Sequence, residues 1–379
     1  MSETGRFIVF IVVALSIWAV FHIYVGWRLS ALAAMAGPHG RRWLWAGLVV
    51  LWAAYPLGRI LERRGLEGVG YPVELVGAVW MGALFLAFLF VLLTDLTLTW
   101  FLTPAAAPVA RGIAAGAAIL LTLIGVAQAT RVPAVGEYEV RLAGLPPGLD
   151  GTVLVAISDL HLGSLLGSGW LRARVDQVDA LKPDVIAVVG DLIDGNADRV
   201  ERLVPEIRRL HAPLGVWAVT GNHEFYAGLD KSLRVFDDSG FRTVRDRWEE
   251  VAPGLIVAGV DDLTARRQFG LGGDHPVDKA LGGRPAGATV FLCHTPWEAQ
   301  RAASLGAGLM ISGHTHDGQI WPFGYLVRLQ YPFLTGLYEI GRMTLIVGRG
   351  TGTWGPPVRL WRRSEILRIT LRSAPAQGD

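Results

Sequence analysis

Short groups of Asp, Asn and His residues follow several apolar, β-branched segments after the first third of this 379-residue sequence. Five segments each end in residues that could bind a metal ion. These residues are Asp159 and His161, Asp191, Asn222 and His223, His294, and His314 and His316. Open α/β sheets place their ligand sites at the carboxyl ends of strands. We therefore expect these side chains to gather at one sheet edge.

Carboxylate, imidazole and amide ligands suit divalent Mn, Fe or Zn, and the single cysteine, Cys293, cannot form a thiolate cage. Asp191 is well placed to bridge two metal ions. Two such ions activate water as hydroxide and neutralise charge on a phosphoryl group. Each short pattern alone is weak evidence for a metal site, because a Gly-Asp pair after a strand, for example, is usually a turn. The occurrence of all five patterns in this order predicts a dinuclear metal centre. Asp261 and Asp262 follow a sixth segment and are weaker candidates.

The ordered blocks D-x-H, G-D, G-N-H-E, H and G-H-x-H resemble those of calcineurin-like metallophosphoesterases over about residues 132–371. The sequences of residues 145–151 and 312–320 are similar to those of a bacterial branch of the family, in which the domain often follows membrane segments. Asp317 stands where that branch more often has glycine, a difference that leaves the pair His314 and His316 intact. The resemblance implies an α/β fold, the αββα two-sheet sandwich.

The same resemblance implies a role for each residue. Asp159, His161 and His316 would hold the first metal, Asn222, His294 and His314 the second, and Asp191 both. His223 would not bind metal but would stand near the leaving-group oxygen as a general acid. Catalysis would thus depend on His223 and Asp191.

Four apolar stretches occupy the first third of the chain, at about 7–27, 43–61, 75–94 and 112–130. Each approaches the ~20 residues that a membrane-spanning helix needs. Buried helices of a soluble protein are the alternative, and a cleaved signal peptide is a second alternative for the first stretch. Except for Arg59 in the second stretch, they contain no Asp, Glu, Lys or Arg. We therefore predict an all-α four-helix transmembrane region that anchors rather than transports.

Three parts follow from this division: a transmembrane region at 1–131, a metallophosphoesterase domain at 132–372 and a disordered tail at 373–379. The formal net charge of +2, without a basic block, predicts no nucleic-acid partner.

Arginine placement predicts the orientation of a multi-pass protein in the inner membrane. The side with the N-terminus has five arginines and the other side has four. These are Arg6, Arg59, Arg63, Arg64 and Arg131 against Arg28, Arg41, Arg42 and Arg111. The small excess favours a cytoplasmic catalytic domain.

The predicted function is hydrolysis of a phosphodiester or pyrophosphate bond, in a lipid-linked substrate or another phosphate ester at the bilayer. A phosphomonoesterase or nucleotidase on the same metal centre is one alternative, and a non-catalytic metal-binding sensor is another. His223 argues against the sensor because it has no metal-binding role. The motifs do not choose between mono- and diester.

Several other residues are predicted to have structural rather than catalytic roles. Cys293 should be a core residue, and Trp354 either lines a pocket or packs internally. The remaining histidines, His22, His39, His211 and His275, are predicted to be structural or surface groups.

Overall fold

The computed structural model describes residues 3–32, 35, 37–163 and 165–374, with side chains of the first helix from Val12 onwards, residue 14 excepted. The chain forms two compact units. A helical unit comprises Met1–Arg131 and Gly355–Trp361, and a catalytic unit comprises Val132–Trp354 and Arg362–Asp379. Each unit is described by itself.

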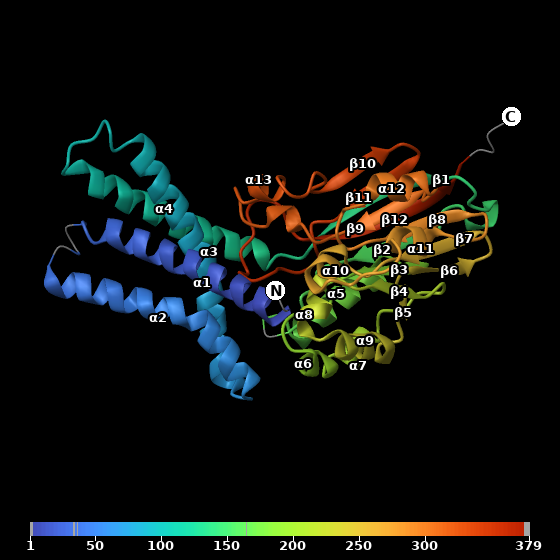
Figure 1. Ribbon diagram of the computed structural model, residues 1–379, viewed down its shortest axis with the longest axis horizontal. Helices are drawn as coiled ribbons and strands as arrows, with labels where there is room; N and C mark the ends of the chain where they lie inside the picture. Colours follow the sequence, from blue (N-terminus) through green and yellow to red (C-terminus); the bar gives the residue numbers. More distant parts are fainter. Residues whose placement is uncertain (1–2, 33–34, 36, 164, 375–379) are drawn as a thin grey trace. The chain divides into compact units, whose positions relative to one another are not determined.

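Four long helices make up most of the helical unit (Figure 1). They are α1 (Glu3–Leu29), α2 (Pro38–Arg63), α3 (Glu67–Thr97) and α4 (Ala106–Ala129). Among the described residues, α2, α3 and α4 are long and apolar enough to cross a membrane. The prediction of four helices is confirmed, but the count of four spans is one too high by this criterion. Part of the predicted span at 7–27 lies outside the described side chains.

Glycines allow α2 and α3 to approach closely. A side chain at Gly77 would overlap the backbone nitrogen of Tyr55, and one at Gly58 would overlap the backbone of Glu74. Small residues at such positions are typical of helix pairs in membranes, where packing replaces the hydrophobic effect as the driving force.

Ion pairs lie at both ends of the apolar part of α3. Glu74 and Asp95 fall just outside the predicted span at 75–94, yet both lie within α3. Glu74 Oε1 is 3.3 Å from Arg59 Nη1. Asp95 Oδ1 is 2.6 Å from Arg111 Nε, and its Oδ2 is 2.6 Å from Arg28 Nε. The helix continues through these charges because arginines of neighbouring helices neutralise them.

A segment from the C-terminal part of the chain, Gly355–Trp361, belongs to the helical unit. The backbone N–H of Arg359 donates to the Gly125 carbonyl of α4 at 3.0 Å, and Arg359 is buried. A side chain at Gly125 would come within 2.5 Å of the Val358 side chain. The predicted 132–372 domain therefore includes seven residues that pack with the helices.

Two six-stranded mixed sheets form the centre of the catalytic unit (Figure 1). The first has the order β1 (Ala134–Leu142), β12 (Glu365–Ser373), β2 (Val153–Ile157), β3 (Val185–Val189), β4 (Val216–Val219), β5 (Arg242–Thr243). The second has the order β10 (Gly336–Ile340), β11 (Met343–Val347), β9 (Leu309–Ser312), β8 (Ala288–Leu292), β7 (Leu255–Gly259), β6 (Arg247–Ala252). The predicted two-sheet α/β fold is confirmed.

The central strands β2, β3 and β4 of the first sheet are apolar because both faces of the sheet are covered there. In β2, Leu154 and Ala156 belong to the core between the sheets, whereas Val155 and Ile157 pack under the helices of the first sheet. Helices α5 (Ser168–Ala180) and α9 (Leu229–Asp238) contribute to that outer layer.

Helices α11 (Pro276–Leu281) and α12 (Ala299–Ser304) cover the second sheet. The thiol of Cys293 is buried in the same apolar cluster. Cys293 is therefore a core residue, as predicted. The shorter helices are α6 (Ala197–Glu201), α7 (Val204–Ile207), α8 (Asn222–Ala227), α10 (Leu263–Phe269), α13 (Gly324–Val327), and the 3₁₀ turns η2 (Pro147–Leu149) and η3 (His316–Gly318). Of the predicted tail, Ser373 ends β12, and 375–379 lie outside the described residues.

Candidate metal centre

Five parallel strands deliver the predicted site residues, each at its carboxyl end. Strands β2, β3 and β4 are parallel neighbours in the first sheet, and β8 and β9 are parallel neighbours in the second. The residues that follow them are Asp159 and His161 after β2, Asp191 after β3, Asn222 and His223 after β4, His294 after β8, and His314 and His316 after β9. The two sheets meet directly here, because His294 Nδ1 lies 2.8 Å from the Val189 carbonyl oxygen at the end of β3.

One group of buried ligand atoms comes from Asp159, His161 and His316, and these atoms lie within 4.8 Å of one another. His316 Nε2 is 3.3 Å from Asp159 Oδ1 and 3.1 Å from His161 Nε2. This is the set that the sequence assigned to the first metal.

A second group comes from Asp191, His294 and His314, again within 4.8 Å of one another. His294 Nε2 lies 3.1 Å from Asp191 Oδ2 and 3.2 Å from His314 Nδ1. Asn222, the remaining residue of this predicted set, has a buried Oδ1 without a hydrogen-bond partner among the described residues.

Asp191 links the two groups. Its Oδ2 is 3.1 Å from His294 Nε2 of the second group and 3.8 Å from His161 Nε2 of the first. Asp159 also approaches the second group, with Oδ1 4.0 Å from His294 Nε2. The two groups are therefore adjacent, and Asp191 stands where a bridging carboxylate is needed.

The backbone is strained at most of these positions. Five of the seven predicted ligands have a left-handed φ between 47° and 69°, a conformation that costs non-glycine residues about 1–3 kcal/mol each. These are Asp159, His161, Asp191, His314 and His316. Backbone bonds hold the turns in place, including Asp159 N–H to the Gly190 carbonyl and His161 N–H to the Asp191 carbonyl, both at 3.0 Å. Strain concentrated at one set of side chains is typical of a functional site.

The donor set fits divalent metal ions. Two pairs of imidazole nitrogens lie 3.1 Å and 3.2 Å apart beside buried carboxylates, a geometry that suits shared cations. Burial lowers the pKa of His161 to about 3, and that of His314 likewise to about 3. Both rings are therefore neutral near pH 7, the form that binds metal.

His223 lies beside this centre but is held differently. Its backbone N–H donates to Asp191 Oδ1 at 2.8 Å, and its ring Nδ1 is 3.3 Å from Asp194 Oδ1. Burial lowers the pKa of His223, but the charges of Asp191 and Asp194 outweigh this and raise the pKa to about 9. The ring is thus cationic at neutral pH and can release a proton.

Asp194 and Glu224 are two site residues that the sequence-based interpretation missed. Glu224 is fully buried and accepts hydrogen bonds from the backbone N–H groups of Asp191, Ile193 and Gly221 at 2.9, 3.0 and 2.6 Å. Its place at the third position of α8, after Gly221, was the available signal, since a glutamate there often caps the preceding backbone. The signal for Asp194 was its position in the same turn as Asp191.

Aromatic residues lie next to the two groups of potential metal ligands, and most of them were not predicted from the motifs. The hydroxyl of Tyr331 lies 2.8 Å from His314 Nε2, opposite the Nδ1 that faces His294. The rings of Tyr226 and Trp354 lie 5.4 Å and 6.2 Å from the His223 ring, and both are about half exposed. Of the two predictions for Trp354, the structure therefore supports the one in which it lines the site.

Asp261 and Asp262, the weaker candidates, have structural partners. Asp261 pairs with Arg245 at 2.7 Å and accepts a hydrogen bond from Thr220 at 2.8 Å. Asp262 caps α10 by accepting from the backbone N–H of Ala265 at 2.7 Å. Within the described part of the chain, three groups of side chains could hold a metal ion, the third being His161, Asp194 and His223. Neither Asp261 nor Asp262 belongs to any of them.

Among the described residues, none of the histidines predicted to be structural or surface groups belongs to a cluster that could hold a metal ion. His22 lies in the helical unit, where its Nε2 accepts from Trp80 Nε1 at 2.9 Å. His211 is exposed, and His275 is 3.5 Å from Glu298.

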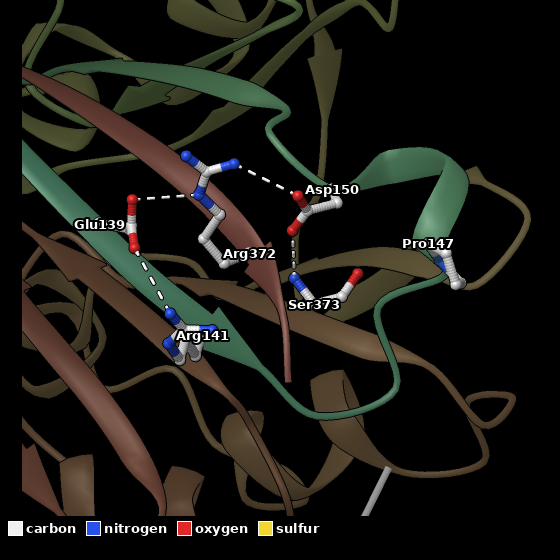
Figure 2. A pocket seen from close by; sticks show the side chains of 6 residues that line it. All are labelled: Glu139, Arg141, Pro147, Asp150, Arg372 and Ser373. Carbon is white, nitrogen blue, oxygen red and sulfur yellow. Dashed lines mark hydrogen bonds and ion pairs between the residues drawn. The ribbon is translucent and has the colours of Figure 1, made fainter. Parts of the chain in front are cut away.

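A polar surface hollow lies at the opposite sheet edge, before the start of β2 (Figure 2). Its wall is charged: Arg372 pairs with Glu139 at 3.0 Å and with Asp150 at 3.2 Å. The Ser373 backbone N–H and Arg372 lower the pKa of Asp150. These pairs fasten the end of β12, and the hollow is separate from the metal centre.

Comparison with known proteins gives a consistent assignment. The family model described as calcineurin-like phosphoesterase matches residues 152–318. The chain is 36% identical over 276 residues to a bovine (Bos taurus) transmembrane protein with metallophosphoesterase domain, a match covering 68% of this chain and 61% of the relative. A protein of the same description from Danio rerio is 35% identical over 266 residues, covering 67% and 61%. The chain thus spans about 61% of the length of these two relatives.

A bacterial relative is matched over nearly its whole length. An uncharacterized metallophosphoesterase of Aquifex aeolicus (strain VF5) is 32% identical over 240 residues, covering 63% of this chain and 91% of the relative. The bacterial match agrees with the branch suggested by the sequence. With the ordered motifs and the two-sheet fold, these likenesses show that the chain belongs to the calcineurin-like metallophosphoesterase family.

Proposed function

We propose that this protein is a dinuclear-metal hydrolase that cleaves a phosphodiester or pyrophosphate bond in an amphiphilic, lipid-linked substrate at the membrane. One observation carries the proposal. Two groups of buried ligand atoms adjoin through Asp191, and His223, held by Asp194, stands beside them.

The proposed ligand sets follow the two groups. Asp159, His161 and His316 would hold one metal, Asn222, His294 and His314 the other, and Asp191 both. When bound, two divalent ions supply positive charge that acidifies water and neutralises the phosphoryl oxygens. Mn, Fe and Zn are the metals that this oxygen and nitrogen donor set favours.

The residues around the ions have separate tasks. Val189 accepts the hydrogen bond that fixes the His294 ring and leaves its Nε2 facing Asp191. Asp194 orients the His223 ring through Nδ1, so that Nε2 is the atom that donates a proton to the leaving-group oxygen. The exposed rings of Tyr226 and Trp354 provide a surface for the organic part of the leaving group.

The membrane setting supports an amphiphilic substrate. The catalytic unit follows α4 after only the four residues 130–133, so it is tethered to the bilayer by a short linker. We also propose a multi-pass protein of the inner membrane with the catalytic unit in the cytoplasm, which rests on the small arginine excess described above.

The proposal is tested with the full-length protein in lipid nanodiscs supplied with Mn²⁺, Fe²⁺ or Zn²⁺. We expect bis(p-nitrophenyl) phosphate to be hydrolysed faster than p-nitrophenyl phosphate, and Asp191→Ala to remove both activities. A control variant, His211→Ala, alters an exposed histidine outside the centre and should leave the rates unchanged.

Two results would contradict the proposal. Faster hydrolysis of the monoester would favour the phosphomonoesterase or nucleotidase alternative. Metal binding without turnover of any phosphate ester, in a folded protein, would favour the sensor.

A further inference from the structure

Large apolar side chains project from one loop of the catalytic unit, which we name the apolar loop (residues 321–329). Its exposed members are Trp321, Phe323, Tyr325, Leu326 and Leu329. Their exposed fractions run from 40% to 84%, with Leu329 the highest. The loop contains α13 and follows shortly after His316 of the metal centre.

The concentration of these residues is unusual for the surface of a catalytic unit. Among the described residues of this unit, ten large hydrophobic side chains are exposed, and five of them fall in these nine positions. The other five are spread along the chain, at Val132, Tyr226, Leu271, Leu337 and Trp354. Single exposed apolar residues need no explanation, but a group of this size marks a surface that meets an apolar partner.

Both ends of the apolar loop are fixed to the metal centre. A side chain at Gly318 would overlap the backbone of Gly324, so the turn that carries His316 packs directly on α13. Beyond the loop, the Tyr331 hydroxyl lies 2.8 Å from His314 Nε2. An interaction that fixes the position of the apolar loop would therefore also fix the residues in contact with His314 and His316.

Short chain connections join the catalytic unit to the helical unit. Residues 130–133, between α4 and β1, reach roughly 18 Å when fully extended. A second connection is made by Arg362, which directly follows the segment packed with the helices and pairs with Asp317 at 3.4 Å. Asp317 is the residue after His316, so the chain leading into the apolar loop is tied to a segment that returns from the helical unit.

The side chains of the loop have the composition of a membrane interface. Trp and Tyr are enriched where headgroups meet acyl chains, and Leu and Phe bury their apolar surface just below. The exposed Arg328 adds a positive charge that complements lipid phosphates. This combination favours lipid over a second copy of the chain or a partner protein.

We propose that the apolar loop rests in the headgroup–acyl boundary of the membrane that the helices span. Lipid contact fixes the turn carrying His316 at the membrane surface, beside the amphiphiles dissolved in it. This interaction goes beyond the proposed activity, and its test requires no turnover.

The test places an environment-sensitive fluorophore on the loop of the full-length protein in nanodiscs. Native Cys293 is fully buried and will not react, so Leu329→Cys gives a single site for an NBD label. Gly148→Cys is the control. It is exposed at the opposite sheet edge, and a side chain there would have open space around it.

We expect NBD at position 329 to emit at shorter wavelength than NBD at 148 and to be quenched severalfold more by lipids with a nitroxide on the acyl chain. Equal emission and quenching at the two positions would overturn the proposal. A blue shift at 329 without lipid quenching would overturn it too, since it would indicate a protein partner or a second copy. Tyr325→Cys repeats the test at a second exposed position if Leu329→Cys does not fold.

Discussion

The carboxylate of Glu224 accepts a hydrogen bond of 2.9 Å from the backbone N–H of Asp191, the residue proposed to bridge both metals. The same carboxylate oxygen accepts from Gly221 N–H at 2.6 Å, so Glu224 joins the turns that follow β3 and β4. Burial, followed by the neighbouring charge of Asp191, raises the pKa of Glu224 to about 7. Glu224 therefore stabilises the strained turn at Asp191, whose φ is 52°.

Replacing Glu224 by glutamine should weaken metal binding without removing the ligands. A carboxamide has one acceptor oxygen in place of two, so its NH₂ group would face a backbone N–H. Loss of such an outer-shell partner typically reduces metal affinity by about 10–100-fold. Activity titrated against Mn²⁺ measures the change, and Glu201→Gln, at an exposed glutamate, is the matched control. Unchanged metal affinity would show that Glu224 has no role in positioning Asp191.

His223→Ala should slow the reaction most for poor leaving groups. A p-nitrophenolate leaves without a proton, whereas an alkoxide needs one, so general-acid catalysis matters only for the second. We expect a loss of about 10²–10⁴-fold with an alkyl diester and a much smaller loss with bis(p-nitrophenyl) phosphate. Steady-state rates on both substrates decide the matter. Equal losses would assign His223 to binding rather than proton transfer.

Asp194→Asn should change the pH dependence of the rate. The pKa of His223 is raised to about 9 against the lowering effect of burial, with Asp191 and Asp194 as the charges that raise it. The acid form is present below this pKa and is lost as the pH rises through it. Removing the Asp194 charge lowers the pKa, so the alkaline limb of kcat/KM should move to lower pH. An alkaline limb at the same pH as in the wild type would exclude Asp194 from this role.

The strands, and the positions of the polar residues that follow them, could be predicted from the sequence because both are local. An apolar β-branched run such as Val185–Val189 predicts a buried strand, and the polar residue after it must lie at the sheet edge. Tyr331 could not be predicted, because its contact with His314 depends on how a long connection folds back. The same holds for Gly355–Trp361, which packs with α4 although it is remote in sequence.

The ion pairs of the helical unit could not be predicted for a related physical reason. The predicted span 75–94 is defined by the apolar residues between Glu74 and Asp95, and hydropathy does not show which partners these two charges have. Their arginine partners lie on other helices, and a single-segment pattern contains no information about such partners.

Removing the metals should destabilise the catalytic unit. The backbone strain at Asp159, Asp191 and three histidines has to be offset by interactions at the centre, and a tightly bound ion contributes about 4 kcal/mol at a thousandfold excess over its Kd. We expect a chelator to lower the Tm of the full-length protein by several degrees and Mn²⁺ or Zn²⁺ to restore it. In Asp191→Asn the shift should be smaller. A Tm that does not respond to chelator would mean that the centre folds independently of metal.

Gly77→Leu should disrupt the α2–α3 pair. The new side chain would overlap the Tyr55 backbone, which cannot rotate away as a side chain could, so the helices must separate at an expected cost of at least about 1–3 kcal/mol. Gly116→Leu is the matched control, because it adds the same side chain at a helical glycine of α4 with open space around it. The measurement is resistance to unfolding in a graded SDS–detergent mixture, followed by the fluorescence of the tryptophans. Gly77→Leu should unfold at a lower SDS fraction than Gly116→Leu, and equal midpoints would show that close helix approach at Gly77 contributes nothing to the stability of the helical unit.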